Sequence, residues 1–278
     1  MTTLLQRKQE LHRLHQSGCF VIPNPWDLGS ARVLVQMGFP ALATTSSGFA
    51  WSEGRSDSAS SLEDALAHFE QIAEGVDVPV SADFQDCFAP DPSGVEKNVL
   101  AAAATGVAGL SIEDSTRDAA TPLFDFALSV ERVQAARAAT RRSDVDLVLT
   151  ARSEGFIVGA PDLDETIRRL TAYADAGADC LFAPGLGTPD QIEAVVQAVS
   201  PKPVNVLVGS DFTTVAALAD LGVRRISVGG ALARAAWGGF LAAAEEISER
   251  GTFSHLGSAT PFGPLDGRFA RTNGNGAT

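Results

Sequence analysis

The chain has 278 residues, of which 45% are hydrophobic and 20% are charged. This balance excludes a disordered protein, because the chain can bury a large apolar core. Lys and Arg number 21 against 34 Asp and Glu, which gives a formal net charge of −13. We therefore expect no nucleic acid and no membrane surface as a partner, since both bind basic surfaces. A local basic pocket for a small anion remains compatible with this charge.

The N-terminal segment, residues 1–18, is charged throughout. It predicts an amphipathic helix and not a secretory signal, whose apolar centre is unbroken. No stretch reaches the roughly 18 uninterrupted apolar residues that a membrane helix needs. The three cysteines are too few for a disulfide framework or a cysteine-rich zinc site. We expect reduced thiols in a cytoplasmic protein.

Eight short apolar runs recur along the chain, and a helical pattern follows each of them. The runs are 19–23, 41–45, 78–83, 109–113, 146–151, 179–184, 203–207 and 224–228. The helical stretches are 28–37, 61–75, 93–105, 129–140, 162–176, 189–199, 213–221 and 231–249. The runs show little polar alternation, which is typical of strands that are buried on both faces.

Eight successive strand–helix units favour a closed parallel (β/α)₈ barrel of the TIM type over an open doubly wound sheet. The expected class is thus α/β. Residues 1–250 would form one barrel domain with an N-terminal helix. Residues 251–278 are rich in Gly and would form a C-terminal extension, either partly loose or packed on a neighbouring subunit.

In a parallel barrel the active site lies at the C-terminal ends of the strands. Asp83 and Glu113 end neighbouring predicted strands, and their oxygens suit Mg²⁺. The alternative is that these acids pair with an arginine or cap helices. Arg152 ends the next strand; it would either hold a substrate carboxylate in a bidentate fork or pair with Glu154 or Glu113. Arg55 would also face the carboxylates.

Several mechanisms lack the residues they require. None of the three lysines follows a predicted strand, so a Schiff-base aldolase is not expected. The four histidines lie in predicted helices or in the tail, which leaves a His-ligated metal site or a catalytic triad without support. Cys87 is the thiol on the predicted catalytic face. It would be either an acid/base group or, as we favour, a passive loop residue.

Two glycine-containing segments could bind an anion. Residues 44–48 could present backbone N–H groups, although Ser/Gly loops are also common turns. Gly229 and Gly230 open the last helix, as in a barrel phosphate site. A tight strand-to-helix turn explains them equally well.

Taken together, these residues resemble the isocitrate lyase/phosphoenolpyruvate mutase superfamily. The resemblance spans about residues 20–239. Its motifs are Pro23-Asn24-Pro25-Trp26-Asp27, Thr45-Ser46-Ser47-Gly48, Gly54 to Asp57, Ser81-Ala82-Asp83, Gly109 to Asp114, Ala151-Arg152 with Glu154, and Pro203-Val204-Asn205-Val206. It implies a (β/α)₈ barrel, Mg²⁺, a small carboxylate substrate bound as a 2-oxo acid or its enolate, and a homo-oligomer built as a dimer of dimers.

The resemblance also implies the metal and catalytic residues. Asp83, and Glu113 through water, would hold Mg²⁺. Arg152 would grip the oxo-acid end of the substrate. Asp57 would lie near the metal-bound waters and act in catalysis with Arg152 and Glu113.

The substrate-binding residues follow in the same way. The backbone amides of Ser47, Gly48 and Phe49 would hold a substrate carboxylate or phosphonate. Arg152 and Asn205 complete the implied set.

The sequence departs from the family pattern in the loop after the fourth strand. Residues 115–123 lack the Cys, Lys and His found in family lyases and the Lys found in phosphonomutases. Isocitrate and methylisocitrate cleavage are therefore disfavoured. Gln85 stands where related members have Glu, and Ser81 stands where many have an acid.

Three hypotheses follow. The first is a Mg²⁺-dependent lyase that acts on a small 2-oxo or hydroxy acid through an enolate, by oxaloacetate-type decarboxylation or C–C cleavage. The second is a phosphonomutase or phosphonate-hydrolysing enzyme. The third is a non-catalytic member that binds a carboxylate.

Overall fold

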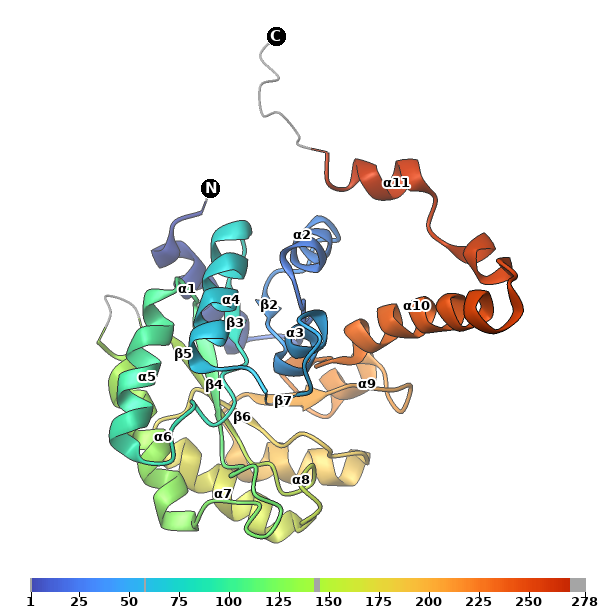
Figure 1. Ribbon diagram of the computed structural model, residues 1–278. Coiled ribbons are helices and arrows are strands. Elements are labelled where there is room, and N and C mark those ends of the chain that lie inside the picture. Colours follow the sequence, from blue (N-terminus) through green and yellow to red (C-terminus); the bar gives the residue numbers. More distant parts are fainter. Residues whose placement is uncertain (1, 58, 143–145, 271–278) are drawn as a thin grey trace. The chain divides into compact units, whose positions relative to one another are not determined.

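A computed structural model describes residues 2–57, 59–142 and 146–270 (Figure 1). The chain divides into two compact units, Met1–Ala231 and Leu232–Thr278. The first unit holds an eight-stranded parallel sheet in the order β1-β8-β7-β6-β5-β4-β3-β2. Its strands are β1 Phe20–Ile22, β2 Leu42–Ala43, β3 Val80–Ala82, β4 Gly109–Glu113, β5 Val148–Arg152, β6 Cys180–Phe182, β7 Val204–Leu207 and β8 Arg225–Ser227. Each lies within or beside one of the predicted runs.

The sheet curls into a nearly closed barrel, as the eight-unit pattern predicts. Strand β1 pairs with β8 in parallel, so the first and last strands meet. No ladder joins β1 to β2 among the described residues. At that seam the Ala43 amide donates to the Pro23 carbonyl at 3.0 Å. The Asn24 side chain spans the same place, donating to the Thr44 carbonyl and accepting from the amides of Val228 and Gly229.

Helices follow the strands around the barrel (Figure 1). In the first unit they are α1 Leu4–Gln16, α2 Leu28–Gln36, α3 Ser46–Ser52, α4 Leu62–Gly75, α5 Pro92–Ala104, α6 Phe126–Thr140, α7 Leu163–Asp175, α8 Pro189–Val199 and α9 Val215–Asp220. Side-chain caps fix many of their starts; Asp27 and Ser61 both form capping boxes. Helix α3 was not predicted. It begins because Thr45 caps it, where the sequence suggested an open anion-binding turn.

Helix α1 closes the N-terminal end of the barrel. Leu11 and Leu14 belong to one apolar cluster with residues at the strand starts, among them Phe20 and Val148. Gly109 makes the close approach feasible, because a Cβ built there would lie 2.9 Å from Leu11 Cδ2. Because α1 covers the N-terminal end of the barrel, the polar residues of the interior face the opening at the C-terminal ends of the strands.

The second unit consists of helices alone within its described part. Helix α10 spans Ala231–Arg250, and η1 Ser254–Ser258 and α11 Phe262–Gly267 follow it. Most of α10 groups with the C-terminal segment, since the second unit begins at Leu232. Residues 271–278 lie outside the described residues, and the prediction of a loose end stays a prediction. No described helix has the length and apolarity needed to cross a membrane.

Candidate active site

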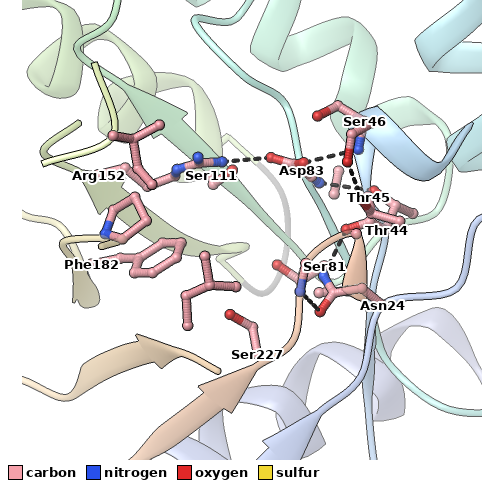
Figure 2. A pocket seen from close by; sticks show the side chains of 18 of the residues that line it. Asn24, Thr44, Thr45, Ser46, Ser81, Asp83, Ser111, Arg152, Phe182 and Ser227 are labelled. Carbon is pink, nitrogen blue, oxygen red and sulfur yellow. Dashed lines mark hydrogen bonds and ion pairs between the residues drawn. The ribbon is translucent and has the colours of Figure 1, made fainter. Parts of the chain in front are cut away.

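A cavity of about 210 Å³ opens at the C-terminal ends of the strands. Every residue that lines it belongs to the first unit. Figure 2 shows the labelled side chains converging on it from β3, β4, β5, β6 and β8 and from the segments after β1, β2 and β3. Its polar lining includes Asn24, Ser81, Asp83, Arg152 and Ser227. This location agrees with the rule that places barrel active sites at this face.

The guanidinium of Arg152 contacts three carboxylates, of which Asp83 and Glu154 line the cavity and Glu113 does not. Its Nη1 lies 2.7 Å from Asp83 Oδ1, its Nη2 3.3 Å from Glu113 Oε2, and its Nε 2.8 Å from Glu154 Oε1. Figure 2 shows the contact between Arg152 and Asp83 as a dashed line. The predicted meeting of Asp83, Glu113 and Arg152 at one rim is thereby found. The salt bridge between Arg152 and Glu154, which the sequence offered as the alternative to substrate binding, is present as well.

Burial and charge act against each other on these groups. Burial raises the pKa of Glu113 well above its usual range; Arg152 opposes this, while Glu154 and Asp83 add to it. Burial likewise raises the pKa of Glu154 against the pull of Arg152. For Arg152 burial lowers the pKa, but the three carboxylates outweigh burial and hold it well above its ordinary value. Glu113 and Glu154 can thus retain a proton at a pH where an exposed glutamate has lost it.

Asp83 is held by backbone and side chain on both sides. Its amide donates to Thr44 Oγ1 at 2.9 Å, and its Oδ2 accepts from the Ser46 amide at 3.0 Å (Figure 2). These bonds join the ends of β2 and β3 and fix the carboxylate beside the cavity. Its orientation therefore does not depend on Arg152 alone.

A second buried network supports Glu154. The Glu154 amide donates to Asp114 Oδ1 at 2.8 Å. Asp114 Oδ2 in turn accepts from the Tyr173 hydroxyl at 2.7 Å and from Arg169 at 3.1 Å. Asp114 is therefore a structural acid that positions its neighbour, although it stands beside Glu113 in the sequence.

The loop after β3 has an unusual backbone. Gln85, Cys87 and Phe88 have φ values of 50°, 58° and 53°, in the left-handed region that non-glycine residues seldom adopt. The buried Arg132 holds the loop by donating to the carbonyls of Asp86, Ala89 and Glu113. Cys87 is fully buried, and burial raises the pKa of its thiol. A passive role for Cys87 agrees with this environment.

The predicted anion-binding amides lie in the first turn of α3. The Gly48 amide donates to Thr45 Oγ1 at 3.3 Å and the Phe49 amide to the Thr45 carbonyl at 3.0 Å. Ser47 lines the cavity, whereas the Phe49 ring stacks on His68 at 4.1 Å beside a separate small cavity. Of these three residues, only Ser47 borders the main cavity.

The remaining predicted residues have mixed positions. Asp57 is exposed and lines the cavity mouth. Asn205 is buried behind the lining, where it donates to Ser227 Oγ at 2.9 Å. Arg55 does not face the carboxylates as expected; it pairs with Asp64 on the surface. The Gly229 amide is taken by Asn24, which favours the tight-turn interpretation over a phosphate site.

Sequence reasoning did not single out Arg225. This residue lines the cavity from β8 and is 4% exposed. A usable signal exists, because Arg225 and Ser227 share one face of the strand by the period of two. A charged side chain within a predicted buried strand is rare enough to require a partner.

The acids present suit Mg²⁺ in their chemistry. No group of three or more His, Cys, Asp or Glu side chains is arranged to hold a metal ion within the part of the chain described. Mg²⁺, however, commonly binds through one or two carboxylates and keeps several waters. Asp83 and Glu113 offer hard oxygen atoms, and three carboxylates face one guanidinium. An added cation would balance that excess of negative charge.

Comparison with known proteins places this barrel and site in a family. The family model described as phosphoenolpyruvate phosphomutase matches residues 11–248. The chain belongs to the phosphoenolpyruvate phosphomutase family. It is therefore a lyase- or mutase-type enzyme of the isocitrate lyase/phosphoenolpyruvate mutase superfamily, as the sequence motifs indicated.

Relatives within the family differ in their reactions. A solved Burkholderia cenocepacia J2315 protein described only as a lyase/mutase is 44% identical, with a TM-score of 0.93 and 97% of each chain covered. A phosphonopyruvate hydrolase solved with oxalate and Mg²⁺ is 28% identical, with a TM-score of 0.81 and coverage of 96% of this chain and 95% of that one. An oxaloacetate decarboxylase of Bradyrhizobium diazoefficiens is 28% identical over 69% of this chain and 68% of its own length.

Proposed function

We propose that this enzyme is a Mg²⁺-dependent lyase that acts on a small 2-oxo or 2-hydroxy carboxylic acid through an enolate, by oxaloacetate-type decarboxylation or C–C cleavage. The observation that carries the proposal is the guanidinium of Arg152 set among Asp83, Glu113 and Glu154 at a small cavity. None of the described lining residues is Lys or His. The similarity to a decarboxylase of oxaloacetate and to a hydrolase that binds oxalate with Mg²⁺ supports it.

Each residue would have a definite task. Arg152 would bind the acid end and stabilise negative charge that develops on the 2-oxo oxygen, the kind of electrostatic contribution that is often largest in catalysis. Glu113, whose pKa burial raises, would take up a proton and then deliver it to the enolate carbon. Asp57, at the mouth of the cavity, would act near the metal-bound waters. Ser47 would border the acid end, with Gly48 and Phe49 behind it in the first turn of α3.

Asp83, and Glu113 through water, would hold the cation. When bound, Mg²⁺ supplies Lewis-acid polarisation of the 2-oxo oxygen. Asn205 would act from behind the lining, through Ser227 and Arg225.

The first test is turnover of a panel of 2-oxo and 2-hydroxy acids with Mg²⁺, followed by product analysis. We expect Arg152→Met to lower kcat/KM by about a hundredfold or more, because one preorganised electrostatic contact is lost. Arg55→Met is the matched control, since Arg55 pairs with Asp64 on the surface. If Arg152→Met turned over as fast as the wild type, the assigned role would be wrong.

Metal binding can be tested without turnover. Mn²⁺ titration followed by electron paramagnetic resonance should show one site per chain that Asp83→Ala weakens by about tenfold or more. Unchanged Mn²⁺ affinity in Asp83→Ala would exclude this carboxylate as a ligand.

Phosphonate chemistry is the second candidate. The phosphonopyruvate hydrolase supports it through its similarity over nearly the whole chain. Phosphorus NMR with phosphonopyruvate separates the two candidates: release of inorganic phosphate, or rearrangement to phosphoenolpyruvate, would support the phosphonate reaction.

We also propose that the protein is cytoplasmic and forms a homotetramer, a dimer of dimers. The cysteines Cys19, Cys87 and Cys180 are free thiols, and large apolar side chains such as Trp237, Phe240 and Phe262 are exposed in the second unit. Sedimentation equilibrium would give the mass of four chains if the assembly is correct and of one chain if it is not.

A further inference from the structure

The β8 residue Arg225 is a buried guanidinium at the inner end of the cavity. Its Nε donates to Asn205 Oδ1 at 3.0 Å and its Nη1 to Thr150 Oγ1 at 2.8 Å. Thr150 precedes Arg152 by two residues on β5. Two strand residues rise by roughly 7 Å, so Arg225 reaches the barrel interior about one side-chain layer below Arg152. Because both arginines line the same cavity, a small molecule can meet both.

Arg225 lacks the charged partner that Arg137, Arg152 and Arg169 have. Arg137 pairs with two aspartates, and Arg169 pairs with Asp114 and Glu165. Arg132 has no ion pair in the described part of the chain but donates to three backbone carbonyls. Within the described residues Arg225 makes no ion pair, and its hydrogen-bond partners are two neutral side chains.

A buried guanidinium without an ion pair lowers the stability of the folded protein. An ion removed from water loses favourable hydration unless an opposite charge or several hydrogen bonds replace it. Burial lowers the pKa of Arg225; Cys180 and the Asp83 carboxylate act to raise it, whereas the positive charge of Arg152 acts to lower it. A guanidinium nevertheless stays protonated near neutral pH. Asn205 and Thr150 hold it in place, and none of the described carboxylates forms an ion pair with it at the cavity that it lines.

We propose that Arg225 binds the second carboxylate of a dicarboxylic substrate and so determines the substrate specificity of the cavity. This inference rests on the proposed function, in which Arg152 binds the 2-hydroxy or 2-oxo acid end. The two guanidinium groups would then hold the two ends of one short dicarboxylate. A monocarboxylate would leave Arg225 unpaired.

This assignment also favours one reaction over the other. In decarboxylation the distal carboxylate must give up its charge to leave as neutral CO₂, which a fixed guanidinium opposes. In C–C cleavage the bond between the hydroxyl-bearing carbon and the carbon beside the distal carboxylate breaks. Its electron pair moves onto that carboxylate as an enediolate, where Arg225 stabilises the added charge. The hydroxyl becomes a carbonyl as its proton passes to Glu113, and Glu113 then returns a proton to the carbon. A 2-oxo acid and a simpler acid are the products.

The test compares malate with lactate, which differ by the second carboxylate. Isothermal titration calorimetry with Mg²⁺ should show that the wild type binds malate about tenfold to a hundredfold more tightly than lactate, as expected for a hydrogen bond to a charged group. In Arg225→Met this preference should disappear, while the lactate affinity stays within about twofold. Arg225→Lys should keep part of the preference, because it keeps the charge.

Three outcomes separate this inference from the proposed function. Equal binding of malate and lactate by the wild-type protein would overturn the inference. This measurement needs no variant, so it remains decisive if Arg225→Met fails to fold. A malate preference that survives in folded Arg225→Met would also overturn it. A malate preference that Arg225→Met abolishes, in an enzyme that turns over none of the acids, would support the subsite and contradict the proposed reaction.

Discussion

At Cys87 a buried side chain sits on a left-handed backbone, next to the acids of the site. A thiol whose pKa burial raises cannot supply the thiolate that nucleophilic or acid/base work requires. The strained loop nevertheless has a use, since it sets the path of the chain directly after Asp83. Strain of this kind persists only where neighbours over-determine the backbone, and Arg132 does so here.

The buried thiol yields a prediction. We expect Cys87→Ala to leave kcat within about twofold of the wild type, since a buried thiol takes no part in the reaction. It should lower the free energy of unfolding by about 1 kcal/mol, because it removes a packed atom. Steady-state kinetics and urea denaturation measure the two effects. A large loss of kcat in a stable variant would instead make Cys87 catalytic.

Thiol titration provides a second, independent readout. Cys87 and Cys180 are buried in the native protein, and Cys19 is partly exposed. An aromatic disulfide reagent should therefore modify at most one thiol per native chain, and all three after unfolding in urea.

Helix α1 shows what an element outside the strand–helix repeat contributes. Leu11 is fully buried against the strand starts, whereas Leu5 on the same helix is 46% exposed. We expect Leu11→Ala to lower the free energy of unfolding by about 3 kcal/mol, through lost burial and the cavity left behind.

The matched control is Leu5→Ala, which should change the free energy of unfolding by less than about 0.5 kcal/mol. Chemical denaturation of both variants tests the difference. Equal effects would mean that the helix does not seal the barrel.

Elements also differ in how far the sequence predicts them. The eight strands follow from continuous apolar runs, because a strand buried on both faces has no polar side. Helix α3 did not follow, since Thr45 to Gly48 has the composition of a turn and becomes helical only because Thr45 caps it. The acids after β3 and β4 and the arginine after β5 were predicted together from the barrel rule. Asn205 and Arg225 show what the sequence could not predict. Asn205 was expected at the cavity and lies behind its lining, whereas Arg225 was not expected and lines it. Which side chain faces the cavity depends on pairing across strands.

On the scale of the whole molecule, buried histidines link stability to pH. Burial lowers the pKa of His15 to about 3 and that of His68 to about 4. The unfolded chain takes up these protons below about pH 6.5, while the folded chain does not until much lower pH. The contribution of these two neutral histidines to the free energy of unfolding is therefore complete above about pH 6.5. It is lost as the pH falls toward 4.

We expect His68→Gln to reduce the loss of stability between pH 7.5 and pH 5 by about 2 kcal/mol relative to the wild type. Urea denaturation at both pH values measures it. The exposed His255 provides the control variant His255→Gln, which should leave the pH dependence unchanged. Glu113 acts in the opposite direction, because its raised pKa makes folding less favourable as the pH rises. Its effect is the same in the wild type and in both variants, so it cancels when their pH dependences are compared.

The seam between β1 and β2 has a consequence for motion. Among the described residues two hydrogen bonds cross this interruption of the ladder: the Ala43 amide donates to the Pro23 carbonyl, and the Asn24 side chain donates to the Thr44 carbonyl. Any widening of the seam would displace the Thr44 wall, and Asp83 with it, relative to the opposite wall. Asn24 also accepts from the amides of Val228 and Gly229 after β8, so one side chain ties the ends of three strands together at the cavity wall.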